Sequence, residues 1–364
     1  MIRSAHIETA KKLIASYEGV QPFHLFLKTY FAANKKHGSK DRKQIASLCY
    51  YWFRWGKAGS SLSDDERWGH IIKYAEEGQV IFSVDEIFPE AELLGNEIDA
   101  ELWAASHLAQ PKVFLRVRPN KLSIILTKLQ YASVAFELLN DTCIAVEAST
   151  PIDQVLEINH EVVVQDYSSQ QVLSALINQS PELIGKAMCW DACAASGGKS
   201  ILAHDLLQPK SLYASDVRPQ MMTQLRKRLQ MANVKFEDLF TADLSIQGNI
   251  PFNLPMMDVV ITDVPCSGSG TWSRTPEGLY NFQPGQLNKF IPLQRAIVEQ
   301  TIAKLKNDGW LVYITCSVFK DENEAQISFF ENELGLECMH MQYYAGYKHK
   351  ADTLFSALLR KKSN

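Results

Sequence analysis

The feature that most constrains the fold of this chain is the alternation of strand-like and helix-like segments after residue 171. Apolar runs typical of buried strands alternate with amphipathic segments typical of helices, in the order 187–190, 200–207, 211–214, 219–232, 258–262, 287–305 and 310–314. Such a rhythm implies parallel strands joined by crossover helices. We therefore expect a doubly wound α/β domain, in which ligands bind beyond the carboxyl ends of the strands.

The first 170 residues follow a different pattern. Helical periodicity marks two longer segments and one short one, at 24–33, 43–55 and 96–107. In the part that follows, two strand-like runs flank a helix-like segment, at 113–118, 123–138 and 143–146. The sequence thus predicts a helical N-terminal domain, a small α+β module and the α/β domain, with bounds at 1–108, 109–168 and 169–364.

The composition limits the classes of protein to which the chain can belong. Hydrophobic residues make up 46% of the 364 residues, which is enough for two or three packed domains. The sequence has no apolar run long enough for a membrane span, and residues 1–8 lack the apolar core of a secretory signal, so we expect a cytoplasmic protein. The seven cysteines are odd in number and include no C-x-x-C pair, which predicts neither a disulfide framework nor a metal site.

The charge is unevenly distributed along the chain. The formal net charge is −4, yet the stretch from Lys28 to Lys57 holds eight basic residues against the single acid Asp41, with aromatic residues interleaved. On its own, this stretch would be interpreted as a solvated helix face over an aromatic core. Beside the motifs described below, a basic patch on an acidic protein favours contact with nucleic acid.

The first strand of the α/β domain leads into a loop of small residues, Asp191-Ala192-Cys193-Ala194-Ala195-Ser196-Gly197-Gly198-Lys199-Ser200. Small side chains and paired glycines let a ligand approach the backbone at the start of a helix. The spacing is neither that of a P-loop nor G-x-G-x-x-G, so a nucleotide phosphate is not the obvious ligand. A Gly-Gly loop by itself is often only a tight turn.

An acid stands at the end of each of the next three predicted strands, as Asp216, Asp243 and Asp263. A single acid in this place is often only a helix N-cap, and Pro219 is suited to begin a helix after Asp216. Three acids at successive strand ends, on the side where ligands bind, favour a binding site instead. Asp216 has the position that holds ribose hydroxyls in dinucleotide folds.

Two cysteines lie at the ends of neighbouring predicted strands. They occur in Asp263-Val264-Pro265-Cys266-Ser267-Gly268 and in Tyr313-Ile314-Thr315-Cys316-Ser317. A single cysteine near a strand end is usually structural. Two cysteines at one edge of a sheet indicate thiol chemistry, in which the thiolate is the nucleophile.

These segments resemble the signature motifs of the RNA cytosine-5 methyltransferases of the RsmB/Sun/Nop group. Members carry an Asp-x-Cys-Ala-Ala-Pro-Gly-Gly-Lys-Thr loop, an Asp-Ala-Pro-Cys-Ser-Gly motif and a Tyr-Ser-Thr-Cys-Ser motif followed by Glu-Asn-Glu. Residues 164–170 are similar to the lead-in to their catalytic domain, and the resemblance extends from about residue 110 to the end of the chain. Three positions depart from the pattern without removing a reactive group: Ser196 replaces Pro, Val264 replaces Ala and Ile314 replaces Ser.

The resemblance implies a Rossmann-like class I methyltransferase domain in residues 169–364. It also implies an RRM-like α+β module before that domain, and the N-terminal helices are similar to a NusB-like RNA-binding domain. The implied cofactor is S-adenosylmethionine, held by the backbone of residues 193–199. Asp216 would hold its ribose, Asp243 would lie near the adenine, and Asp263 would border the methionyl end.

The resemblance also assigns the chemistry. Cys316 would attack carbon 6 of a cytosine, and Cys266 would assist release by removing the proton from carbon 5. Asp263 would hydrogen-bond the ring edge of the base, and Lys199 would lower the thiol pKa or hold the substrate. RNA contacts are expected from four basic residues, Lys40, Arg42, Arg218 and Arg274, although a plain surface position explains the last two nearly as well.

The substrate is less constrained than the reaction. Analogy with NusB-like members favours small-subunit ribosomal RNA and, by default, a monomer. A methyltransferase for tRNA or for protein, an RNA-binding assembly factor without activity, and a nicotinamide-dependent oxidoreductase remain alternatives. The paired cysteines argue against a protein substrate, the intact motifs argue against lost activity, and the missing G-x-G-x-x-G argues against the oxidoreductase.

Overall fold

A computed structural model describes residues 2–78 and 82–363 of the chain. Met1, residues 79–81 and Asn364, which fall in the predicted first and last domains, lie outside the described residues. The contacts divide the chain into two compact units. The first comprises Met1–Leu94, Asp99–Gln110 and Thr271–Pro284, and the second comprises Gly95–Ile98, Pro111–Gly270 and Gly285–Asn364. The domain bounds drawn from the sequence stay a prediction.

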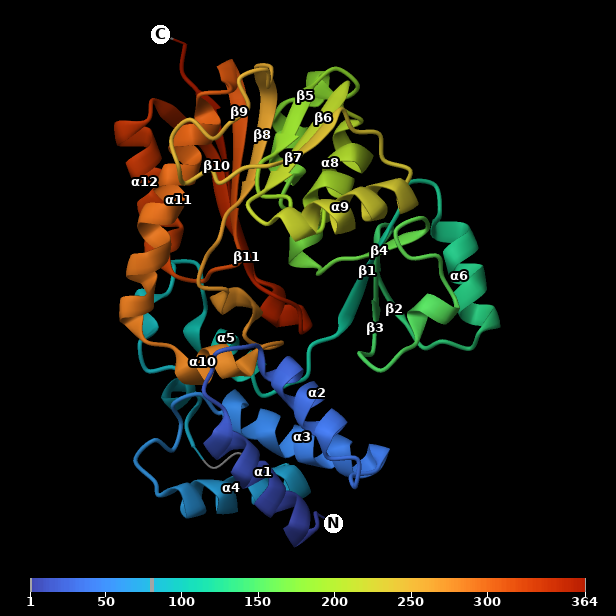
Figure 1. Cartoon of the computed structure of the whole chain (residues 1–364), viewed down its shortest axis with the longest axis vertical. Helices are drawn as coiled ribbons and strands as arrows, with labels where there is room; N and C mark the ends of the chain where they lie inside the picture. The colour runs from blue at the N-terminus through green and yellow to red at the C-terminus, as the bar shows by residue number, and fades with distance from the viewer. Residues whose placement is uncertain (1, 79–81, 364) are drawn as a thin grey trace. The chain divides into compact units, whose positions relative to one another are not determined.

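The first unit is helical and has an aromatic core. Its helices are α1 (Ser4–Ser16), α2 (Phe23–Ala33), α3 (Ser39–Arg54), α4 (Asp64–Glu77), α5 (Ala100–Ser106) and α10 (Pro276–Asn281). The helices predicted at 24–33 and 43–55 are confirmed as α2 and α3. Phe23, Trp52 and Phe53 are buried between these helices, and α10 packs against α3 (Figure 1).

The second unit begins with a small antiparallel sheet. Its strands are β1 (Val113–Val117), β2 (Glu137–Asn140), β3 (Cys143–Val146) and β4 (Val162–Val164), in the order β2-β3-β1-β4. Helix α6 (Leu122–Tyr131) packs Ile125 and Leu129 against the apolar side chains of this sheet. This part of the chain is therefore an α+β module with its own core.

The helix predicted over 123–138 is too long, because α6 ends at Tyr131. Ser133 takes a left-handed conformation with φ 53°. The Val134 N–H donates to the Leu129 carbonyl, and the Ser133 N–H donates to the Gln130 carbonyl. This pair of bonds is the Schellman arrangement that terminates helices, and it releases the chain into β2.

A seven-stranded sheet forms the centre of the second unit. Its strands are β5 (Met188–Asp191), β6 (Ser211–Asp216), β7 (Asp238–Thr241), β8 (Met257–Asp263), β9 (Leu305–Thr315), β10 (Leu336–Tyr344) and β11 (Leu354–Lys361). The order is β10-β11-β9-β8-β5-β6-β7. Strands β9, β8, β5, β6 and β7 pair in parallel, and β11 lies antiparallel between β9 and β10. The predicted, mostly parallel Rossmann-like sheet is confirmed.

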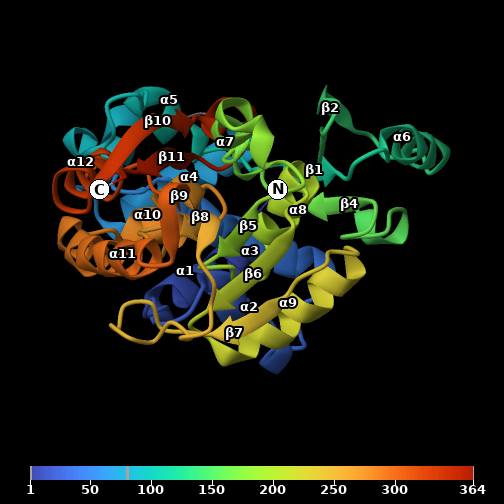
Figure 2. The same ribbon diagram turned by 90° about the horizontal axis from the view of Figure 1, so that it is seen from above.

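Helices cover both faces of this sheet. The helices are α7 (Ser174–Gln179), α8 (Gly198–Leu207) and α9 (Pro219–Met231) on one face, and α11 (Leu287–Ile302) and α12 (Glu324–Glu333) on the other (Figure 2). Alternation along β8 supplies both cores, because Val259 and Ile261 join the α7–α9 side while Val260 points the other way. Among the residues that the structure describes, no helix combines the length and hydrophobicity that a membrane span requires.

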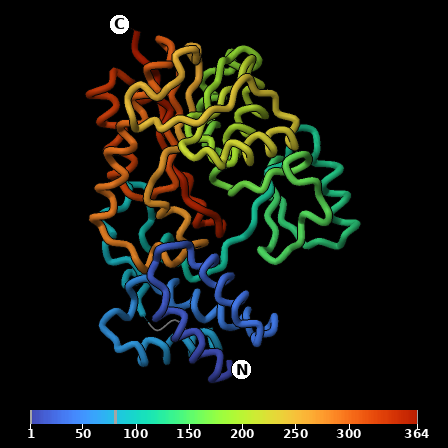
Figure 3. The backbone as a smooth tube through the Cα atoms, in the orientation of Figure 1, coloured from blue at the N-terminus to red at the C-terminus, as the bar shows by residue number. Residues whose placement is uncertain are grey.

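The segment between β8 and α11 leaves the second unit. Residues 271–284, which include α10, belong to the first unit. The chain trace shows this orange segment beside the blue N-terminal helices (Figure 3). Gly270, the last residue before the segment, is held within the second unit, because its N–H donates to the Cys316 carbonyl and its carbonyl accepts from the Thr353 N–H.

Candidate active site

The parallel strands bring the predicted motifs to one edge of the large sheet. Asp191, the last residue of β5, pairs in register with Ile261 of β8, and Asp263 at the end of β8 pairs with Ile314 of β9. Because parallel strands end on the same side, the loops that follow them gather at this edge. The edge carries the loop 192–197, the acids after β6, β7 and β8, and both predicted cysteines.

The two cysteines lie next to each other. The Sγ atoms of Cys266 and Cys316 are 3.3 Å apart. The hydrogen bond with Cys316 and burial raise the pKa of Cys266 well above its usual range. The two thiols are therefore close enough to exchange a proton and to act on the same atom pair of a substrate.

An ion pair lies beside the cysteines. The Lys199 Nζ, on the first turn of α8, is 2.8 Å from Asp263 Oδ2, and the Lys199 side chain is 11% exposed. Burial by itself disfavours the charged Lys199 ammonium. The charge and hydrogen bond of Asp263, with a smaller contribution from the Cys316 charge, outweigh burial and raise the pKa of Lys199. A permanent positive charge is thus held near Cys316.

The loop after β5 takes strained turns that small residues permit. Ala195 has φ 46° and Gly197 has φ 87°. The left-handed φ of Gly197 favours glycine at this helix start, and a Cβ there would also displace a Leu225 methyl group 2.5 Å away. The Ser196 hydroxyl, at the position where the family pattern has Pro, accepts a 2.7 Å hydrogen bond from Arg228. The residue that departs from the pattern therefore has a partner, Arg228, which no local sequence pattern predicts.

Asp216 is a buried acid with several hydrogen-bond donors around its carboxylate. Its Oδ2 accepts from the Ala195 N–H, and its two oxygens accept from Arg218 Nε and Nη2 at 2.8 and 3.0 Å. Burial disfavours the charged carboxylate, but the Arg218 hydrogen bonds and charge lower the pKa of Asp216 below its usual range. Asp216 is therefore an ionised acceptor at the end of β6.

Asp191 is a further functional candidate at this edge. It is fully buried, its Oδ2 accepts from the Ser200 hydroxyl at 2.6 Å, and its Oδ1 has no hydrogen-bond partner among the described residues. Burial raises the pKa of Asp191 to about 7. Its place as first residue of the small-residue loop was the only signal in the sequence.

A cavity of about 560 Å³ opens at this edge, which is a typical size for a small-molecule site. Its walls are Ala192, Cys193, Ala195, Asp216, Val217, Arg218, Ala242, Asp243, Leu244, Ser245, Asp263, Val264, Pro265, Leu293 and Ile297. Apolar side chains such as Val217 and Leu244 suit a flat base, whereas the carboxylates suit hydroxyl and amino groups. The residues present therefore fit a nucleoside joined to an amino acid, and the carboxylates in the wall fit its ammonium group.

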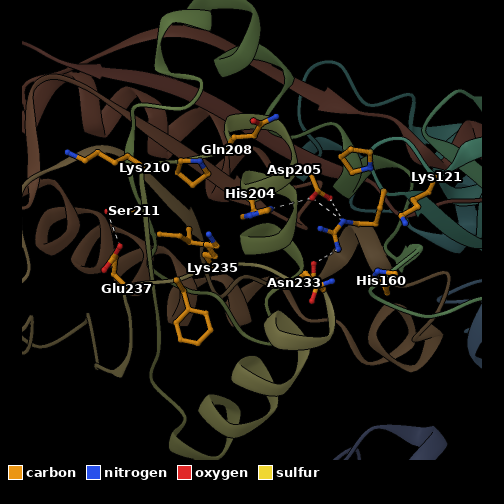
Figure 4. A pocket seen from close by; sticks show the side chains of 16 residues that line it. Lys121, His160, His204, Asp205, Gln208, Lys210, Ser211, Asn233, Lys235 and Glu237 are labelled. Carbon is orange, nitrogen blue, oxygen red and sulfur yellow. Dashed lines mark hydrogen bonds and ion pairs between the residues drawn. The ribbon is translucent and has the colours of Figure 1, made fainter.

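A second cavity, of about 570 Å³, lies at the other end of the strands, where β6 begins (Figure 4). Its wall includes Lys121, Lys210 and Lys235. The acids there are already engaged, since Asp205 pairs with Arg118 and Glu237 accepts from a serine hydroxyl. None of the predicted site residues lines this cavity, so the candidate chemistry belongs to the carboxyl edge.

The four predicted RNA contacts belong to different units. Lys40 and Arg42 lie in the first turn of α3, and the Arg42 Nε donates to the His37 carbonyl. Arg274 lies in the segment 271–284 of the first unit. Of the four, Arg218 lines the cavity at the carboxyl edge, with its side chain 50% exposed.

The sequence matches a known protein family over residues 181–357, whose model is described as 16S rRNA methyltransferase RsmB/F. A probable ribosomal RNA small subunit methyltransferase B from Synechocystis is 35% identical over 171 residues, which are 46% of this chain and 36% of that protein. A protein of the same description from Bacillus subtilis is 30% identical over 247 residues, which are 64% of this chain and 52% of that protein. The matches therefore span about half or less of these relatives.

The fold is also similar to solved structures. A methyltransferase homolog protein from Pyrococcus horikoshii superposes with a TM-score of 0.62 at 20% sequence identity, over 82% of this chain and 100% of that chain. At 20% sequence identity, this similarity shows a shared fold and nothing more. It agrees with the Rossmann-like sheet and the helices on its two faces.

Proposed function

We propose that residues 181–357, which match the RsmB/F family model, form a methyltransferase domain, and that the chain methylates carbon 5 of a cytosine in small-subunit ribosomal RNA. The observation that carries the proposal is the 3.3 Å separation of the Cys266 and Cys316 sulfur atoms beside the Lys199–Asp263 ion pair. Methyl transfer to an amine or carboxylate needs no thiol. Methyl transfer to a pyrimidine carbon uses one thiol as nucleophile and gains from a second as base.

In the first step, the Cys316 thiolate forms a bond to carbon 6 of the cytosine. The electron pair of the 5,6 double bond moves toward the ring edge, where Asp263 would accept a hydrogen bond from the amino group. The Lys199 ammonium places a positive charge near Cys316. Carbon 5 thereby becomes nucleophilic enough to take a methyl group, which S-adenosylmethionine supplies when bound.

In the second step, Cys266 acts as the base. It removes the proton from carbon 5 after methyl transfer, and the electron pair left behind re-forms the 5,6 double bond. The Cys316–carbon 6 bond breaks at the same time, and Cys316 leaves as a thiolate. The 3.3 Å separation of the two sulfur atoms places Cys266 beside the cysteine that leaves in this step.

S-adenosylmethionine is the donor that fits the cavity at the carboxyl edge. Asp216 would accept from its ribose hydroxyls, and Asp243 would lie beside the adenine. Residues 193–199 would surround the methionyl part, with Asp191 or Asp263 near its ammonium group. The carboxylates and apolar walls described above support this assignment.

The RNA would reach this edge with its target base unpaired or flipped out of the helix. The names of the relatives favour ribosomal RNA of the small subunit over tRNA. Such a substrate places the reaction in the cytoplasm. Arg218 at the cavity and Lys40, Arg42 and Arg274 in the first unit are the proposed contacts to the phosphate backbone.

The proposal is tested by trapping the covalent adduct. With Cys266→Ala, ribosomal RNA and S-adenosylmethionine, we expect a protein–RNA adduct that survives denaturing electrophoresis, because the base that permits release is missing. The double variant Cys266→Ala/Cys316→Ala should form no adduct. Cys338→Ala, which changes a partly exposed cysteine on β10, should methylate like the unchanged protein.

Two outcomes would contradict the assignment. Full methylation by Cys316→Ala would show that Cys316 is not the nucleophile. Methyl groups found on tRNA alone would leave the chemistry intact and replace the substrate. Bisulfite sequencing of ribosomal RNA from a strain without the gene would identify the methylated base.

A further inference from the structure

Two consecutive residues after β9 hold the loops of both cysteines. Glu322, at the end of a short 3-10 helix (Lys320–Glu322), and Asn323, the residue that follows it, are fully buried. Asn323 has the unusual backbone angles φ −122° and ψ −94°. Neither residue touches the cavity of the proposed cofactor. Their hydrogen bonds instead run to the residues on either side of Cys266 and Cys316.

Side chains of α11 and Glu322 form hydrogen bonds with the peptide groups on both sides of Cys266. The Ser267 N–H, just after Cys266, donates to Glu322 Oε1 at 2.9 Å. The Pro265 carbonyl, just before Cys266, accepts from Gln294 Nε2 at 3.1 Å. Gln294 Nε2 also donates to Glu322 Oε1 at 3.0 Å, so the two side chains form one bracket around the cysteine.

Asn323 binds the residues on both sides of Cys316. The Thr315 hydroxyl, just before Cys316, donates to Asn323 Oδ1 at 2.6 Å. Asn323 Nδ2 donates to the Ser317 carbonyl, just after Cys316, at 2.9 Å. Asn323 Nδ2 also donates to the Tyr343 hydroxyl at 2.9 Å, which ties the amide to β10.

We propose that Glu322 and Asn323 are positioning residues that set the separation of the two sulfur atoms. Each residue brackets one cysteine, and the single peptide bond between them links the two brackets. The Cys266 loop and the Cys316 loop therefore cannot separate unless one of these buried hydrogen bonds breaks. The catalytic meaning of this clamp rests on the proposed function, whereas its geometric claim does not.

Glu322 has a further effect on Cys266. Its Oε2 is buried and has no hydrogen-bond partner among the described residues. Its charge is one of the influences that raise the pKa of Cys266, after the hydrogen bond to Cys316, burial and the Cys316 charge. A glutamine at this position would keep an oxygen to accept from Ser267 and Gln294 but would lose the charge. The two roles of Glu322 are thus separable by substitution.

The geometric claim is tested through the ease of forming a disulfide between Cys266 and Cys316. In a glutathione buffer, the two thiols lose two protons and two electrons, and glutathione disulfide accepts them and becomes two thiols. The equilibrium gives the effective concentration of one thiol at the other. Peptide mapping by mass spectrometry identifies and quantifies the bond.

Four variants and one control separate the clamp from general stability. Glu322→Ala and Asn323→Ala remove a bracket, Glu322→Gln removes only the charge, and Thr315→Val removes one hydroxyl with little change of shape. Thr301→Val is the control, because Thr301 is equally buried on α11 and its hydroxyl bonds only the Val298 carbonyl. Circular dichroism and thermal melts establish which variants are folded.

We expect the effective concentration to fall at least about tenfold in the two alanine variants, because intramolecular reactions slow when the reacting groups lose their fixed orientation. Thr315→Val should lower it at least roughly fivefold, the contribution of one net hydrogen bond, because this hydroxyl donates to Asn323 Oδ1 and also accepts from the Ser317 N–H. Glu322→Gln and Thr301→Val should stay near the unchanged protein. If Thr315→Val and every folded alanine variant kept the original effective concentration, the clamp would be disproved.

Methylation kinetics then connect the clamp to the reaction. For Asn323→Ala we expect kcat to fall about 100-fold while KM for RNA stays the same, because a displacement of about 1 Å at reacting atoms has this effect. Glu322→Gln should keep the sulfur spacing but shift the pH profile of adduct release to lower pH, since the pKa of Cys266 falls without the charge. A shifted disulfide equilibrium with normal kcat would uphold the clamp and refute the roles assigned to the cysteines.

Discussion

Asp191, at the carboxyl edge of the sheet, is an acid whose burial disfavours its charged form. It is fully buried, and burial raises its pKa to about 7, whereas the unfolded chain has an aspartate pKa of about 3.9. Between these values the folded state binds more protons than the unfolded state. The free energy of unfolding therefore decreases as the pH rises through this window and levels off above it.

Asp191→Asn should remove this part of the pH dependence. The amide keeps an oxygen to accept from Ser200 and carries no charge to desolvate. Relative to the unchanged protein, we expect the variant to gain roughly 2–3 kcal/mol in free energy of unfolding between about pH 5 and pH 7, at about 1.4 kcal/mol for each pKa unit. Urea unfolding at several pH values measures the free energy of unfolding of both proteins. If the difference between them did not change with pH, the prediction would be contradicted.

Asp216 makes a second prediction at the residue scale. If its carboxylate accepts from ribose hydroxyls, Asp216→Asn should weaken S-adenosylmethionine binding by roughly 10- to 100-fold, the value of a hydrogen bond to a charged group. Isothermal titration calorimetry measures the dissociation constant. Asp238→Asn, at the exposed start of β7, is the matched control. An unchanged constant in Asp216→Asn would remove Asp216 from the cofactor site.

The sequence predicts the location of residues that directly follow a parallel strand. A residue at the end of a parallel strand must lie at the binding edge, which is how Asp216 and Cys316 were found. Some partners of the loops at this edge come from distant helices and follow from no local pattern. Arg228 at Ser196 and Gln294 at Pro265 are such partners, since only the packing of α9 and α11 brings them to the loops.

Among the elements, the turn at Gly270 is tied most directly to the Cys316 loop. The Gly270 N–H donates to the Cys316 carbonyl, and its carbonyl accepts from the Thr353 N–H. A Cβ at this position would lie 1.9 Å from the Thr353 carbonyl oxygen. A buried backbone group cannot move aside as a flexible side chain does, so this turn requires glycine.

Gly270→Ala should therefore displace the Cys316 loop. We expect a loss of about 1–3 kcal/mol in stability, the usual cost of overpacking, and a larger fractional loss of adduct formation than of RNA binding. Thermal melts and filter binding measure the two effects. Gly285→Ala, where a Cβ meets nothing within 4 Å, is the control, and equal behaviour of the two variants would refute this account.

The elements themselves differ in how far the sequence predicted them. The parallel strands were found because their buried apolar runs alternate with amphipathic helices. The pair β10 and β11 was not found, since β10 alternates buried and exposed residues at the margin of the sheet and its pairing with β11 depends on the tertiary fold. The end of α6 at Ser133 was missed because its left-handed turn uses serine rather than glycine.

At the scale of the whole molecule, the sequence order and the folding units do not coincide. Residues 271–284 follow the Cys266 motif directly but share the core of the first unit. Leu279 and Phe282 are almost fully buried there, and the Phe23 N–H donates to Glu277 of the same segment at 3.0 Å. No periodicity in the sequence reveals that a helix more than 200 residues away completes the core around Phe23.

Leu279→Ala should consequently weaken a unit formed mostly by residues far away in sequence. Leu279 is fully buried, and its side chain lies against Gly56, so truncation leaves a cavity that costs about 2–5 kcal/mol. We expect faster hydrogen exchange in α2 and α3, with little change in β5, β8 and β9. Leu202→Ala, in α8 of the second unit, should show the reverse pattern. If either variant lowered protection uniformly over the chain, the two units would unfold as one, and the segment 271–284 would transmit instability to the Cys266 loop.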